Sequence, residues 1–321
     1  MRANLLGIAR FRSWLLLLLK LAIFALVAWF VRGTLIRAWE QLGEYPLRLA
    51  PLWLLLAGAV YLIGLAPAAL FWYYVLRVLG QRPGFAETLR AYYVGHLGKY
   101  VPGKALVVII RAGMVGGKQV HLGVAAGSVF VETLTMMAAG AFIAALTVAV
   151  GLREEVMLFW GAVGLMLLAV LPTLPPVFRP VAKALLSRKD PAVAEKLRKL
   201  RYRTLALGWL CMAVVWVVVG ASLWCVLRAM GIEQFSPWYD LPVLTATVAL
   251  ATVAGFLSLI PGGLGVRDLV LIHLLAHPAL FALSQIQAAV AGALLRIVWL
   301  LAELLISAML YGGMLMMHRE R

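Results

Sequence analysis

The sequence predicts an all-α polytopic membrane protein with about six spanning helices and two re-entrant hairpins of broken helix, arranged as an inverted repeat. Three observations support this fold class. The chain of 321 residues is 64% hydrophobic and only 13% charged, which leaves too little polar surface to cover a soluble core. Its long apolar runs match the roughly 20 residues that a helix needs to cross a bilayer. Two further apolar stretches are interrupted by Pro-Gly sequences.

The apolar runs indicate one integral membrane domain, residues 1–321. The predicted spans are 13–31, 52–78, 121–150, 156–172 (short), 204–228 and 284–313. The first run follows three arginines, as the apolar part of a signal peptide would, but no small-residue cleavage site comes after it. We therefore expect a retained anchor. The only cysteines, Cys211 and Cys225, both fall inside one span and are expected to be packing residues.

The net charge of +16 is explained by membrane topology rather than by nucleic-acid binding. If the N-terminus is cytoplasmic, 21 of the 29 Lys and Arg residues fall in the cytoplasmic segments 1–12, 77–118, 173–203 and 318–321. This asymmetry follows the positive-inside rule. It predicts a plasma (inner) membrane protein with both termini cytoplasmic. The basic cytoplasmic loop 173–203 is also suited to rest on anionic head groups.

Two Pro-Gly breaks define the predicted hairpins. The first is Pro102-Gly103 in the stretch 85–118, and the second is Pro261-Gly262-Gly263, followed by Gly265, in the stretch 241–281. A break at membrane depth frees backbone groups that lipid cannot satisfy, so it persists where protein or a water-filled cavity covers it. Paired breaks of this kind are typical of transport sites.

Aligning the two prolines pairs two halves of the chain. Each half, 45–155 and 204–313, reads as span, broken hairpin, span. Basic residues bracket the first hairpin, whereas the second begins and ends in charge-poor sequence, so we expect inverted copies. One alternative stays open, because the apolar residues 241–260 are numerous enough to span a bilayer by themselves.

Ionisable residues accompany these features at membrane depth, where they are expensive and functional by default. Cations flank the two tips, and carboxylates lie within spans or just after the second tip. On the last span, Arg296 and Glu303 are seven residues apart and therefore share one helix face. The candidate substrate-binding residues are Lys104, Arg111, Glu132, Arg267, Asp268, Arg296 and Glu303, and Lys99 also flanks the first tip.

Arginines beside helix ends and free backbone amides suit a phosphate or phosphodiester, because guanidinium binds phosphate oxygens in a bidentate manner. The carboxylates could pair with these arginines in the empty state or recognise an ammonium group. Alternatively, all these charges form structural ion pairs that hold the hairpins to the bundle. The sequence holds no Walker loop, no HExxH and no Ser-His-Asp spacing, so we expect no cofactor, no metal and no catalytic residue.

These motifs resemble the transmembrane, flippase-like region of lysylphosphatidylglycerol synthases and their stand-alone relatives. The resemblance rests on the stretch 98–104 with Arg111, on Glu132, and above all on the stretch 260–268, and it covers about residues 13–315. It implies a lipid-translocating module, here a stand-alone member without the separate synthase domain. It does not imply lysyl transfer.

The resemblance and the charges together predict a flippase or scramblase rather than an enzyme. Its partners would be membrane lipids, with a phosphate-bearing substrate such as a phospholipid, an aminoacylated phosphatidylglycerol or a polyprenyl-phosphate-linked lipid. Without an ATP motif, movement would be downhill or ion-coupled. Two rivals stay open: a membrane enzyme acting on polyprenyl phosphate, and a membrane partner that anchors a glycosyltransferase or lipid-modifying enzyme through the loop 173–203.

Overall fold

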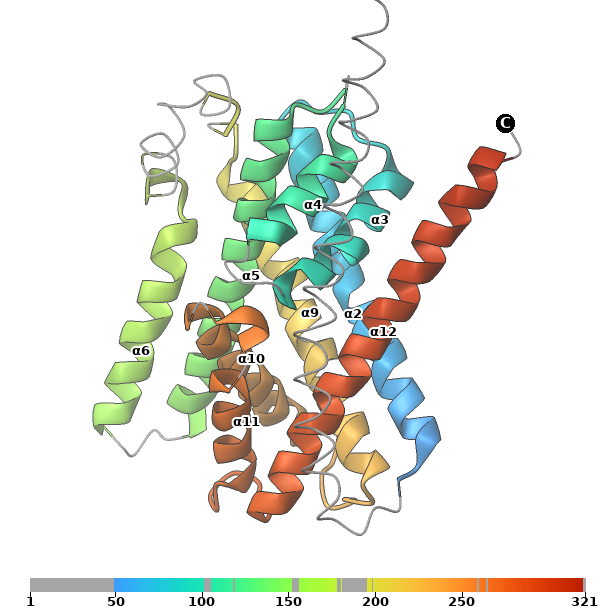
Figure 1. Ribbon diagram of the computed structural model, residues 1–321. Coiled ribbons are helices and arrows are strands. Elements are labelled where there is room, and N and C mark those ends of the chain that lie inside the picture. The colour runs from blue at the N-terminus through green and yellow to red at the C-terminus, as the bar shows by residue number, and fades with distance from the viewer. Residues whose placement is uncertain are drawn as a thin grey trace, which may run out of the picture.

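The regular elements in the described part of the chain are helices. A computed structural model describes residues 49–100, 105–117, 119–151, 156–177, 180, 195–197, 199–258, 260–263 and 265–319 (Figure 1). Every regular element in these residues is an α-helix or a 3-10 helix, and none is a strand, which confirms the all-helical class. The predicted span 13–31, the tip residues Pro102 and Gly103, the candidate Lys104 and most of the loop 173–203 lie outside the described residues.

Four helices of the described chain are long and apolar enough to cross a membrane. They are α2 (Pro51–Val78), α5 (Leu122–Gly151), α9 (Tyr202–Ala229) and α12 (Gln285–Arg319). Each begins within two residues of a predicted span. The predicted span 156–172 is also helical, as α6 (Val156–Val170), but its 15 residues reach only about 22 Å. The all-helical, multi-pass membrane character is therefore as predicted, and one predicted span is shorter than the bilayer requires.

The centre of the bundle is the pair α2 and α9, and α5 and α12 both pack against this pair. Small residues let the two backbones approach. A Cβ atom on Gly64 would lie 2.8 Å from Cγ1 of Val218, and one on Gly208 would lie 2.4 Å from Cζ of Phe71. Both glycines therefore give space to a large neighbour on the facing helix.

Helices α2 and α9 end in the same way. Each closes with Val-Leu-Arg-x-x-Gly, at residues 75–80 and 226–231. Gly80 and Gly231 both adopt φ of 75°, and their N–H groups donate to the carbonyl oxygens of Arg77 and Arg228 at 3.0 and 3.1 Å. Glycine adopts this left-handed conformation without steric cost, so it stops both helices at the same point of the motif.

The first predicted hairpin consists of α3 (Phe85–His96), the 3-10 turn η1 (Leu97–Tyr100) and α4 (Ala105–Val115). Neither arm exceeds 12 residues, about 18 Å, so neither crosses a bilayer alone. The arms pack against each other, and α4 packs against α5.

The second hairpin consists of α10 (Leu241–Leu257), the 3-10 turn η3 (Pro261–Gly263) and α11 (Val266–Ala276). Helix α10 ends before the break, and α11 packs back against it. The stretch 241–276 is thus a broken helical pair and not one continuous helix.

The tips of the two hairpins meet inside the bundle. Turns η1 and η3 are in contact, and a Cβ atom on Gly262 would lie 3.2 Å from Cδ1 of Tyr100. Figure 1 shows the α3–α4 pair toward one end of the bundle and the α10–α11 pair toward the other. Tyr100 and Gly262, about 160 positions apart in the sequence, therefore lie against each other in the fold.

Candidate functional site

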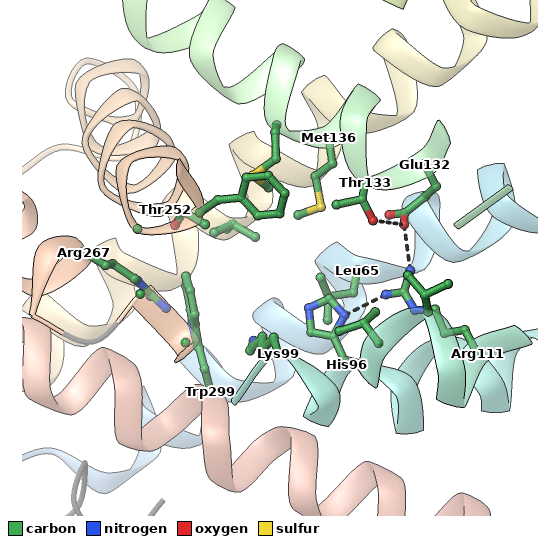
Figure 2. A pocket seen from close by; sticks show the side chains of 18 of the residues that line it. Leu65, His96, Lys99, Arg111, Glu132, Thr133, Met136, Thr252, Arg267 and Trp299 are labelled. Atoms are coloured by element: carbon green, nitrogen blue, oxygen red, sulfur yellow. Dashed lines mark hydrogen bonds and ion pairs between the residues drawn. The ribbon is translucent and has the colours of Figure 1, made fainter. Parts of the chain in front are cut away.

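A cavity of about 380 Å³ lies where the two tips meet (Figure 2). Both hairpins and helices α2, α5, α9 and α12 contribute to its wall. The polar side chains among its lining residues are Tyr61, His96, Lys99, Arg111, Glu132, Thr133, Thr252 and Arg267. Most of the remaining wall is apolar, as in ligand pockets where a few polar groups orient the ligand.

Arg111 is held at one end of the cavity by an ion pair. Its Nη1 donates to Oε2 of Glu132 at 2.7 Å, and the two side chains are only 2% and 1% exposed. The guanidinium also lies 3.9 Å from the ring centroid of Tyr92, whose hydroxyl donates to Oε1 of the same carboxylate at 3.1 Å. A Cβ atom on Gly95 would come within 2.4 Å of Cγ of Arg111. The glycine therefore makes room for the arginine between the two arms of the first hairpin.

His96 is coupled to this arginine. Its Nδ1 lies 3.0 Å from Nη2 of Arg111. Arginine carries only donors, so Nδ1 must accept, and the proton of the neutral ring must sit on Nε2. His96 thus offers one further donor beside Arg111, in the same cavity (Figure 2).

Lys99 lies at the first tip and pairs across the bundle. Its Nζ is 2.5 Å from Oε1 of Glu303 on α12, and the hydroxyl of Tyr61 donates to the same oxygen. The lysine is 26% exposed and lines the cavity, whereas Glu303 is 1% exposed and does not. This pair joins the first hairpin to the last helix.

Arg267 lies near the other tip and has no carboxylate partner among the described residues. Its guanidinium carbon is 4.5 Å from the ring centroid of Trp299, and its buried Nη2 has no hydrogen-bond partner. Thr252 on α10 lines the same cavity, and its Oγ1 is also buried without a hydrogen-bond partner. Arg267 is only 8% exposed, so its charge lies in a low-dielectric setting, where the described residues give it no counter-ion.

The Trp299 indole lies between Arg267 and Lys99 in Figure 2. It stacks on Tyr61 with ring centroids 4.4 Å apart, and its Nε1 donates to Oγ of Ser222 at 2.9 Å. Two of the lining cations are therefore separated by a fixed aromatic wall.

Asp268 and Arg296 form a third ion pair, outside the cavity lining. Nη2 of Arg296 donates to Oδ1 of Asp268 at 2.6 Å, which joins α12 to α11. Oδ2 of Asp268 accepts from the N–H of Gly265 at 3.1 Å and caps α11. The aspartate therefore uses both oxygens for structure.

The tip glycines of the second hairpin adopt conformations that other residues rarely adopt. Gly262, Gly263 and Gly265 have φ of 58°, 66° and 82°. A Cβ atom on Gly263 would lie 2.9 Å from Cα of Gly255 and 3.2 Å from Cβ of Arg267. The sharp reversal after Pro261 thus places the chain directly against α10 and sets the position of Arg267.

The candidate residues of the sequence divide into two groups. Arg111, Glu132 and Arg267 line one cavity, while Asp268, Arg296 and Glu303 lie behind its wall. Structural ion pairing, the alternative left open by the sequence, describes three pairs: Lys99 with Glu303, Arg111 with Glu132, and Arg296 with Asp268. It does not describe Arg267.

Sequence reasoning missed four polar lining residues, Tyr61, His96, Thr133 and Thr252, and noted Lys99 only as a cation flanking the first tip. The position of Lys99, three residues before Pro102, was a usable signal. Nothing in the sequence around His96 or Thr252 marked those two, because both depend on contacts between distant helices.

A comparison with known families matches residues 17–307 to the model described as the lysylphosphatidylglycerol synthase TM region. A search of curated proteins found no match.

Proposed function

Since the chain belongs to the family of the lysylphosphatidylglycerol synthase transmembrane region, we propose that it moves a phosphate-bearing lipid between membrane leaflets, as a flippase or scramblase. The substrate would be a phospholipid, an aminoacylated phosphatidylglycerol or a polyprenyl-phosphate-linked lipid. Its head group would bind in the cavity between the two hairpin tips.

The observation that carries this proposal is Arg267. It is a buried cation with a free donor, it faces a cavity, and the described residues offer it no counter-ion. Such a charge is costly unless an anion joins it. A phosphate group would accept from its Nη2 and from Oγ1 of Thr252, and so satisfy both groups at once.

The paired cations of the cavity would act next. Lys99 and Arg111 each hold one carboxylate in this state. A phosphate that reaches them can replace a carboxylate oxygen as acceptor, because both are anionic oxygen ligands. Helix α4 also begins at Ala105, a lining residue, so the positive end of its dipole faces the same space.

Alternating exposure of the site is the mechanism that this architecture favours. The shared Val-Leu-Arg-x-x-Gly ends of α2 and α9 and the two hairpins at opposite ends support an inverted repeat of 45–155 and 204–313. In this proposal the two halves rock about the tip contact in an inner membrane, with both chain termini cytoplasmic. Movement is downhill or ion-coupled.

The test is leaflet exchange in liposomes that contain purified protein and head-group-labelled lipids. We expect the wild type to accelerate exchange of at least one phosphate-bearing lipid. Arg267→Ala should slow it roughly tenfold or more, because a charged hydrogen bond contributes about 1.5–3 kcal/mol. Arg267→Lys keeps the charge but loses the guanidinium fork, so its exchange rate should lie between those of the wild type and Arg267→Ala.

Arg228→Ala is the matched control. Arg228 also lies on a helix and over aromatic rings, but its ion pair with Glu233 is outside the cavity. Equal losses in the Arg228 and Arg267 variants would contradict the proposal. Recovery of chemically altered lipid from the same liposomes would favour the enzyme alternative instead.

A further inference from the structure

Among the described residues, the cavity reaches the exposed surface beside α5. Among its lining residues, Ala105 at the start of α4 and Phe130 on α5 are exposed, the latter by 54%. Lining residues from α2, α9 and α12, such as Leu65, Trp216 and Trp299, are buried. The opening therefore lies over α5, on the outer surface of the helical bundle.

Helices α4 and α10 form the two edges of this opening. Both pack against α5, but they make at most marginal contact with each other. Figure 1 shows α4 toward one end of α5 and α10 toward the other, so the gap lies between them along α5. In a spanning bundle this position is at the depth of the hydrocarbon layer.

The surface around the opening is apolar. Ile109 on α4, together with Leu257 and Ile260 beside the second tip, is exposed. Inside the opening, the wall continues with Met136 and Met137 of α5. Methionine is flexible and polarisable, which suits a surface that must adapt to chains of differing shape.

We propose that this opening, defined by Ala105, Phe130 and the methionines behind them, is a lateral port for the hydrocarbon tails of the lipid whose head group occupies the cavity. The inference rests on the proposed function. The cavity, at about 380 Å³, is near the lower limit of small-molecule pockets, so head group and long tails do not fit together inside it. The phosphate goes to Arg267, and the tails leave across Phe130.

Two measurements test the port. In the first, exchange is compared for Phe130→Trp, which narrows the opening, and for Leu146→Trp at an exposed apolar position of α5 outside the cavity. We expect a several-fold loss for the first variant and none for the second. The loss should be greater for two-tailed phospholipids than for their single-tailed lyso forms.

In the second measurement, unmodified protein is photolabelled in liposomes by a phospholipid that carries a diazirine on its acyl chain. Adducts at Met136 and Met137 are expected, and Arg267→Ala should reduce them while adducts at Leu146 persist, because bulk lipid labels that outer site regardless. This measurement needs no variant that is altered at the port itself, so it does not depend on such a variant folding.

The two ideas can fail separately. If the wild type exchanges lipid, but Phe130→Trp matches Leu146→Trp and the methionines stay unlabelled, the port is wrong and the transport proposal stands. If the wild type exchanges no lipid while labelling of the methionines still depends on Arg267, the port is a lipid-binding site and the transport proposal fails. A photo-crosslink from residue 130 to another segment of this chain, in place of lipid, would also overturn the port.

Discussion

The guanidinium of Arg111 and the carboxylate of Glu132 lie 2.7 Å apart across α4 and α5, and both side chains are almost fully buried. Each charge has the other as its ionic partner, and burial without that partner would be costly. The pair therefore fixes the second arm of the first hairpin against a long helix, in the same way that Asp268 and Arg296 fix the second arm of the other hairpin against α12.

Removing one member of the Arg111 pair should destabilise the protein more than removing both. Glu132→Ala leaves a buried cation and should lower the free energy of unfolding by about 3–5 kcal/mol. The double variant Arg111→Met, Glu132→Leu removes both charges and should be closer to the wild type. Unfolding in detergent micelles measures this, and a double variant as unstable as the single one would contradict it.

The Lys99–Glu303 pair should respond asymmetrically, since only the lysine reaches the cavity. Glu303→Gln leaves Lys99 where water can solvate it. Lys99→Ala leaves the buried Glu303 carboxylate without its cation and out of reach of solvent, so the unfolding free energy of this variant should be lower than that of Glu303→Gln by about 1 kcal/mol or more. Lys99→Arg, which keeps the charge, is the control. Equal midpoints of thermal unfolding for Lys99→Ala and Glu303→Gln would show that the burial of the remaining charge does not determine how much stability is lost.

Asp268 should stabilise the fold in two separable ways, through its ion pair with Arg296 and through its cap on α11. Asp268→Asn loses the charge beside Arg296 but keeps an oxygen that can accept from Gly265. Asp268→Ala loses that N-cap as well, which should cost about 1 kcal/mol more. Thermal unfolding of the two variants gives the difference directly. If the two variants unfold at the same temperature, the capping interaction does not contribute to stability.

Gly263→Ala should impair both stability and lipid exchange. The residue has a positive φ, and the added Cβ would press on the backbone of Gly255 and on Arg267. We expect about 1–3 kcal/mol of destabilisation from the conformation alone, and slower exchange because Arg267 is displaced. Gly161→Ala on α6 is the control, since a Cβ there meets nothing within 4 Å. It should be neutral, or stabilising by about 0.5–1 kcal/mol.

Thr252→Val should weaken lipid binding without destabilising the fold. Its Oγ1 is buried and unpartnered, so the isosteric valine removes an unsatisfied group. If Thr252 binds the phosphate, apparent affinity in the exchange assay should fall about threefold to tenfold, from the typical 0.5–1.5 kcal/mol of one hydrogen bond. An unchanged affinity with raised stability would mean that the hydroxyl does not contact lipid.

Helix positions could be predicted because apolar length and Pro-Gly punctuation are local. The span predicted at 52–78 is α2 at Pro51–Val78, and the one predicted at 121–150 is α5 at Leu122–Gly151. The break in the second hairpin could also be predicted from local sequence, because Pro261 and the glycines after it favour a turn in any setting. Length alone did not show that α10 stops short and reverses.

The site was less accessible to sequence reasoning, because pairing partners are set by tertiary packing. Lys99 and Glu303 are 204 positions apart. Periodicity placed Arg296 and Glu303 on one face of the last helix, and both do contact hairpin residues, Asp268 and Lys99. It could not show that Trp299, between them on that face, reaches the cavity while they stay behind it.

The anchoring of Trp299 has a consequence for substrate range. Its indole N–H binds Ser222, and the Ser222 hydroxyl donates to the carbonyl of Ala57, so α12, α9 and α2 are tied together behind the ring. This side of the chamber is stiff, while the opposite side carries the pliable thioethers of Met136 and Met137. We therefore expect lipids with tails of unequal shape to share one anchoring point at the phosphate and to differ only in how far their tails push those thioethers aside.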